Sequence, residues 1–163
     1  FPGPESRWLL VAALCICLVA DVVIGLNFIA GMLVFLAAHL LLIVYYLSLA
    51  PFQWQSILVF GVLYGAVVAF FWRFIPKLGK RLVPFAVYPA VLMAMFSIAA
   101  LLPFSVPVPG VWIIAAGALL FCVSDMILGY TQINGSSSVT RCMVMILYYP
   151  AVYCLGLSGV YMV

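Results

Sequence analysis

The sequence predicts an all-α fold, a polytopic transmembrane bundle of about six helices in one domain. Of its 163 residues, 70% are hydrophobic and only 6% are charged, which leaves too little polar surface for a soluble domain. Each apolar run has roughly the 17–25 residues that a membrane-spanning helix requires. The runs are too continuous for barrel strands, which alternate over about ten residues. They cover residues 8–26, 28–48, 55–72, 84–102, 110–130 and 139–162.

Turn-forming residues separate these runs in order. The breaks fall at Asn27, at Ala50-Pro51, at Pro76 with the basic residues up to Arg81, at the proline-rich segment from Pro103 to Gly110, and at the Asn134–Ser138 loop. The four tryptophans fall at predicted helix ends, as in an interfacial aromatic belt. They are Trp8, Trp54, Trp72 and Trp112.

The basic residues predict the orientation. Arg73, Lys77, Lys80 and Arg81 lie between the third and fourth runs, and Arg141 follows the fifth, so all five fall on one side of a six-helix topology. The positive-inside rule makes that side cytoplasmic and places residue 1 outside. We therefore interpret the net charge of +3 as a topology signal, with contact to anionic lipid as the alternative and no nucleic-acid partner.

Two of the three acidic residues, Asp21 and Asp125, lie inside apolar runs, whereas Glu5 lies near the N-terminus. A carboxylate in hydrocarbon is costly, so an intramembrane acid is a functional-site candidate. Each Asp is followed four residues later by a glycine, Gly25 or Gly129. The alternative is that the two acids only cap or bridge helices.

Topology brings further polar residues to the same half of the bundle. His39 on the second helix and Tyr148 and Tyr149 on the sixth are expected at a depth similar to that of the two acids. Gly31, Phe35, His39 and Tyr46 share one helix face, and Gly31 would let a neighbouring helix approach closely. Arg141 shares a face with Tyr148. A core histidine, packing tyrosines and an interfacial arginine anchor are the alternatives.

The sequence resembles one known family at three places. Ala20-Asp21 followed by Phe28, Gly31, Phe35 and Ala38-His39 resembles the first signature of the YhhN/lysoplasmalogenase membrane proteins, and residues 117–125, ending in Ser124-Asp125, resemble their GALLF-x-x-SD motif. Tyr148-Tyr149 before Ala151 resembles a late YY-x-A-Q motif, in which Val152 replaces the Gln. The family usually has about eight helices, so we expect an N-terminal helix to be missing from this chain.

The resemblance implies an enzyme, an intramembrane hydrolase that cleaves the vinyl ether bond of a lysoplasmalogen to a fatty aldehyde and a glycerophospho-head group. This chemistry needs a carboxyl group that stays protonated near neutral pH, which apolar surroundings favour, and a second group that stabilises a cation. We expect Asp125 to donate the proton, Asp21 to stay ionised, and His39 and Tyr148 to assist. Arg141, Tyr149 and Ser124 are the expected substrate-binding residues, and no metal or cofactor is expected.

Two other functions stay open. The first is a small transporter or proton-relay protein, in which Asp21, His39 and Asp125 pass a proton. The second is a non-catalytic membrane subunit. The lysophospholipid substrate and the bilayer are the expected partners, with oligomeric state open. The expected location is a bacterial plasma membrane or a eukaryotic endomembrane.

Overall fold

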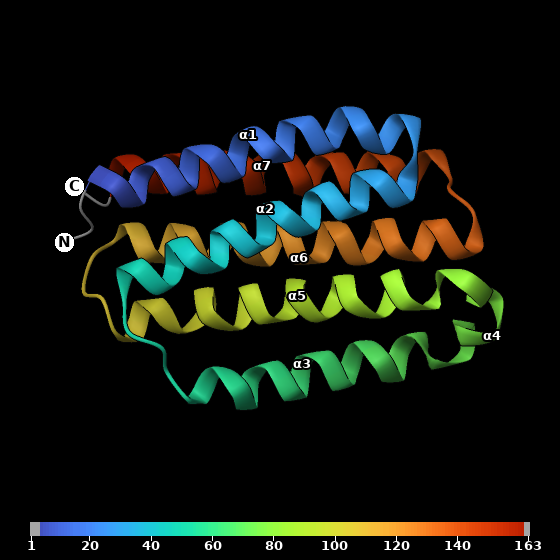
Figure 1. The fold of residues 1–163 in the computed structure, drawn as a ribbon, viewed down its shortest axis with the longest axis horizontal. Coiled ribbons are helices and arrows are strands. Elements are labelled where there is room, and N and C mark those ends of the chain that lie inside the picture. Colours follow the sequence, from blue (N-terminus) through green and yellow to red (C-terminus); the bar gives the residue numbers. More distant parts are fainter. Residues whose placement is uncertain (1–3, 162–163) are drawn as a thin grey trace.

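The computed structural model describes residues 4–161, which form an all-helical bundle without β-strands, as predicted (Figure 1). Five apolar helical stretches are long enough to cross a membrane, and one of them, Gln55–Phe104, folds back on itself. The chain is therefore an integral membrane protein whose long helices run side by side. These are α1 (Pro4–Leu26), α2 (Phe28–Leu49), α3 (Gln55–Phe71), α5 (Leu82–Leu101), α6 (Gly110–Asn134) and α7 (Ser138–Tyr161).

The fold-back lies at α4 (Ile75–Leu78), a single turn flanked by 3-10 turns. Gly79 has a φ of 49°, a left-handed conformation that glycine adopts without steric penalty. This turn makes α3 and α5 antiparallel neighbours (Figure 1). The long stretch therefore supplies two of the six expected helices.

The helix α6 is longer than the sequence predicted. It continues past residue 130 to Asn134 and ends before Gly135, whose φ is 93°. The polar residues near its end do not break the helix, since the Thr131 hydroxyl donates to the Leu128 carbonyl within the same turn. Asp125 therefore lies nine residues, or about 13 Å, from the end of α6 rather than the predicted five residues.

The helices α1 and α2 form one of the closest pairs in the bundle. Asn27 caps α2, because its side chain accepts a hydrogen bond from the Ala30 amide at 3.0 Å. A Cβ atom added at Gly31 would lie 2.4 Å from the Ile24 Cα, so only glycine allows this approach. The predicted role of Gly31 is confirmed.

Five of the six basic residues lie at one end of the bundle, as predicted, whereas Arg7 lies near the start of α1 at the other end. The turn between α1 and α2, the α4 segment and the loop before α7 all lie there, opposite the chain termini (Figure 1). Lys77 Nζ donates to Asn134 Oδ1 at 3.3 Å and joins α4 to the end of α6. We call this the basic end. Its cytoplasmic location stays a prediction, and residue 1 lies outside the described residues.

The core is centred on α2, which packs against both α1 and α5. Its buried face carries Phe35, His39, Leu42 and Tyr46. In contrast, α3 lies at the edge of the bundle, where Ser56 is its only buried residue. All four tryptophans are exposed at helix ends, which fits the predicted aromatic belt.

Candidate functional site

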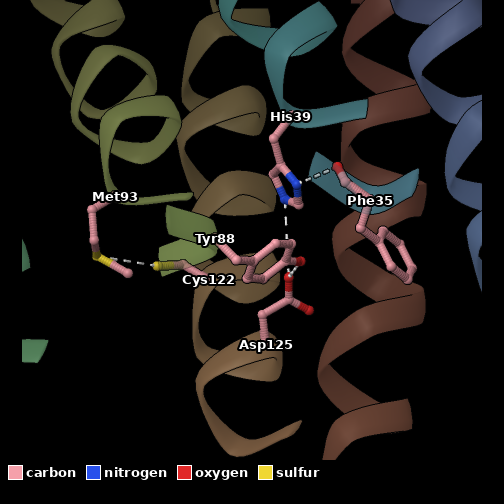
Figure 2. Close-up of polar contacts among 6 residues, drawn as sticks. All are labelled: Phe35, His39, Tyr88, Met93, Cys122 and Asp125. Atoms are coloured by element: carbon pink, nitrogen blue, oxygen red, sulfur yellow. Dashed lines mark hydrogen bonds and ion pairs between the residues drawn. The ribbon is translucent and has the colours of Figure 1, made fainter. Parts of the chain in front are cut away.

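Asp125 lies on α6 with only 5% of its surface exposed. The Tyr88 hydroxyl, from α5, donates a hydrogen bond to Asp125 Oδ2. His39, from α2, places Nε2 4.0 Å from the same oxygen. Figure 2 shows the imidazole and the phenol converging on this carboxyl from two different helices. A buried carboxyl thus has polar neighbours on its oxygen and apolar residues elsewhere.

His39 is held in place by its own helix and by rings. Its Nδ1 lies 2.6 Å from the Phe35 carbonyl oxygen, one turn earlier on α2 (Figure 2). Its ring meets those of Tyr88 and Phe121 edge to face, with centroids 5.6 Å and 4.9 Å away. The Nε2 atom is buried and has no hydrogen-bond partner among the described residues. An unpaired buried nitrogen is costly, and in the described part of the chain Nε2 is a free polar atom beside the Asp125 carboxyl.

Tyr88 was not among the predicted site residues, because no motif marks the apolar run in which it lies. The available signal was its position. Tyr88 follows Arg81, at the basic end, by seven residues, which is about 10 Å along a helix. That rise places the phenol at a depth comparable to Asp125. Its neighbour Pro89 lies inside α5 and removes one amide donor from that helix.

Asp21 has different surroundings. It lies at an exposed position on α1, and the Tyr148 hydroxyl of α7 donates to its Oδ2 at 2.9 Å. The Tyr148 ring is buried and packs edge to face against Phe35 and Phe121, at 5.9 Å and 5.3 Å. Because Phe121 also contacts His39, aromatic rings connect the neighbourhoods of the two acids.

Three other predicted site residues lie apart from this cluster. Ser124 is fully buried, and its hydroxyl donates to the Val144 carbonyl of α7 at 3.1 Å, so it joins two helices. Tyr149 is 63% exposed on the outer surface, and its ring is tilted by 59° against that of Tyr148, with centroids 5.6 Å apart. Arg141 is exposed in the first turns of α7, at the basic end. Their roles in substrate binding stay predictions.

A cavity of about 100 Å³ adjoins Asp125, mostly between the basic-end halves of α2, α3, α5 and α6, with α4 and Ile24 of α1 also lining it. Asp125 and Tyr88 line this cavity, whereas Asp21, His39 and Tyr148 do not. The expectation that the predicted catalytic residues share one cavity is therefore wrong for those three. The reason is Phe35, which lines the cavity and also packs against Tyr148, so its ring separates the two.

The model of the YhhN family matches residues 2–159, so the chain belongs to this family. No curated protein and no solved structure matches the chain.

Proposed function

We propose that this protein is a lysoplasmalogenase, which hydrolyses the vinyl ether bond of lysoplasmalogens. Membership in the YhhN family supports this proposal. One structural observation carries it: a buried carboxyl, Asp125, lies beside an apolar cavity and accepts a hydrogen bond from Tyr88. The apolar surroundings suit an acid that must hold its proton until substrate arrives, and the Tyr88 hydroxyl orients the carboxyl.

In the first step, the Asp125 carboxyl transfers its proton to the β-carbon of the vinyl ether. The C=C π electrons form the new C–H bond, and the positive charge spreads over the α-carbon and the ether oxygen. The Asp125 carboxylate left behind stabilises this oxocarbenium ion by its negative charge. Tyr88 keeps donating to the carboxylate and so holds it in one orientation.

In the second step, water adds to the α-carbon and gives a hemiacetal, and the proton that the water loses passes to the Asp125 carboxylate and restores the acid. Asp21, which lies outside the cavity, serves as the ionised partner through its charge alone, and His39, whose Nε2 lies 4.0 Å from Asp125 Oδ2, helps to orient the water. The hemiacetal hydroxyl then releases its proton as the C–O bond to glycerol breaks, the glycerol oxygen takes up one proton, and the α-carbon becomes the carbonyl of a fatty aldehyde. The balance is one vinyl ether and one water to one aldehyde and one glycerophospho-alcohol.

Arg141 is the proposed contact for the phosphate. It lies at the basic end, where the head group of a membrane-embedded lysolipid is expected, and a guanidinium matches phosphate geometry. Tyr149 is the proposed second contact because its exposed phenol lies on the same helix, two turns deeper.

The test is aldehyde release by purified protein in lipid nanodiscs. Asp125→Asn and Asp21→Asn keep side-chain shape but remove the acid, so each should lower kcat on the order of 10²-fold or more. Glu5→Gln, at the remaining acidic residue, is the matched control and should keep full activity. The rate of the unaltered protein should fall as pH rises through the pKa of the donor carboxyl. Full activity in both Asn variants, or no aldehyde from any lysoplasmalogen, would contradict the proposal.

A proton relay is the second candidate, and one observation favours it. Asp21 is exposed and hydrogen-bonded to Tyr148, Asp125 is buried with His39 Nε2 4.0 Å away, and the Phe121 ring lies in contact with both Tyr148 and His39. A pH-sensitive dye trapped in proteoliposomes would detect such a relay. Proton flux that Asp125→Asn abolishes, in protein without hydrolase activity, would favour this function.

A further inference from the structure

The cavity beside Asp125 is elongated along the helices. Its inner end is formed by Phe35, Tyr64 and Tyr88, and its outer end, at the basic end, by Phe28 and Leu78. Phe28 and Phe35 are seven residues apart on α2, so the cavity extends along about 10 Å of the bundle. Asp125 lies at the inner end together with Tyr88.

The apolar walls of this cavity favour an apolar ligand. Apart from Asp125 and Tyr88, which hydrogen-bond to each other, the lining side chains are apolar or already bonded. The Tyr64 hydroxyl donates to the Ala86 carbonyl at 3.2 Å. A glycerol hydroxyl or a phosphate inside the outer part of the cavity would lose its hydration without gaining partners. A hydrocarbon chain would lose nothing there.

Gly129 leaves room in the outer part of the cavity. It lines the cavity one helical turn beyond Asp125, and a Cβ atom added there would meet nothing within 4 Å. Positions four residues apart lie on the same helix face. Gly25 follows Asp21 at the same spacing and is equally open, but it does not line the cavity. Only one of the two Asp-to-Gly spacings therefore borders an internal space.

We propose that this cavity binds the single hydrocarbon chain of the substrate, with the double bond at Asp125 and the chain passing Gly129 toward α4. This inference rests on the proposed function and adds a direction to it: the chain lies on the α3–α5 side of Asp125, and the head group leaves on another side. Gly129 and the cavity mouth then set which chain lengths are accepted.

The experiment compares Gly129→Leu with Gly25→Leu. The ligands are alkyl-ether lysophospholipids, which lack the vinyl group and cannot be hydrolysed, with butyl or hexadecyl chains. Binding is measured in nanodiscs by displacement of a fluorescent lysolipid. Gly129→Leu should weaken hexadecyl binding by about tenfold or more, because a single methylene in an apolar pocket already changes recognition by about tenfold. Butyl binding should stay within about twofold, and Gly25→Leu should change neither.

Leu82→Trp provides a second test from α5, because Leu82 lines the outer part of the cavity and is partly exposed. It should reduce hexadecyl binding selectively, even where Gly129→Leu fails to fold. Equal losses for both chain lengths would mean that the head group passes Gly129, and unchanged hexadecyl binding in both variants would exclude the cavity. Either result overturns the inference.

The inference and the proposed function fail in different ways. If binding depends on chain length but no aldehyde is released, the assignment of the cavity to the hydrocarbon chain is supported and the proposed hydrolase activity is contradicted. Aldehyde release with an unchanged chain preference in Gly129→Leu would retain the hydrolase and remove the cavity assignment.

Discussion

Replacing Gly31 with alanine should destabilise the contact between α1 and α2. The added Cβ would lie 2.4 Å, 2.5 Å and 2.6 Å from the Cα, Cβ and N atoms of Ile24. Two of these are backbone atoms, so a side-chain rotation cannot relieve the overlap. Reaching an ordinary contact of 3.4 Å requires the helices to separate by about 1 Å at this point.

The expected cost of this overlap is about 1–3 kcal/mol, the range for inserting a methyl group into a packed interior. Replacing glycine also improves helix propensity by up to about 1 kcal/mol, which masks part of the cost. Gly25→Ala is therefore the matched control, because Gly25 has a similar gain but no atom within 4 Å of the added Cβ. The difference between the two variants isolates the overlap.

The assay is unfolding of both variants by SDS titration from mixed micelles, followed by far-UV circular dichroism. Gly31→Ala should unfold with a free energy about 1–3 kcal/mol below that of Gly25→Ala. Because Asp21 is three residues before Ile24, and His39 follows Gly31 on α2, the shift should also reduce activity. Equal stability of the two variants would refute the close approach of α1 and α2.

Four further predictions concern single residues. Ser124→Ala removes the hydrogen bond between α6 and α7 and should lower the free energy of unfolding by about 1 kcal/mol in the same SDS titration. Tyr148→Phe removes the partner of Asp21 and should reduce kcat with little change in KM, measured by aldehyde release. Arg141→Ala should raise KM more than it lowers kcat, and unchanged kinetics would make Arg141 a topology anchor. A cysteine in place of Lys80, beside the Gly79 turn, should react with impermeant maleimide only from the cytoplasmic side, and labelling from outside alone would reverse the orientation.

The helices were predictable because each is a continuous apolar run ended by residues that break helices. The starts of α2 at Phe28 and of α6 at Gly110 match the predicted runs at those positions. The predicted helix ends were less accurate than these starts, and α6 is the example. Thr131 and its polar neighbours continue α6 toward Asn134, because polarity at a membrane boundary does not by itself stop a helix.

The site was less predictable than the helices. The sequence indicates how deep each polar residue lies and which face of its helix it occupies, but not which residue of another helix it contacts. Spacing correctly grouped Gly31, Phe35 and His39 on one buried face. Adjacent positions point about 100° apart on a helix, so Tyr148 and Tyr149 face different neighbours. Tyr148 is buried and Tyr149 is exposed. Which of them reaches Asp21 depends on how α1 crosses α7, and no local pattern encodes that.

The cavity was beyond prediction for a related reason. Its walls come from α1 to α6, and these helices, which are separated in sequence, enclose the space only after the fold-back at α4. An open space depends on residues that fail to fill it, such as Gly129, and a small residue has no distinctive pattern. A sequence shows directly which polar groups are costly to bury. It does not show directly where the packed helices leave a cavity.

The bond between His39 Nδ1 and the Phe35 carbonyl has a chemical consequence. A carbonyl oxygen only accepts, so the ring hydrogen of neutral His39 must reside on Nδ1, and Nε2 presents a lone pair toward Asp125. The imidazole is therefore locked as one tautomer, an acceptor aimed at the acid, and any proton it gains arrives from that side alone. Glutamine at position 39 could offer a donor and an acceptor as well, but its amide could not take up a proton from the acid. Nitrogen-15 chemical shifts of the ring would record the tautomer directly, and would register any proton passing between carboxyl and imidazole as a change at one nitrogen.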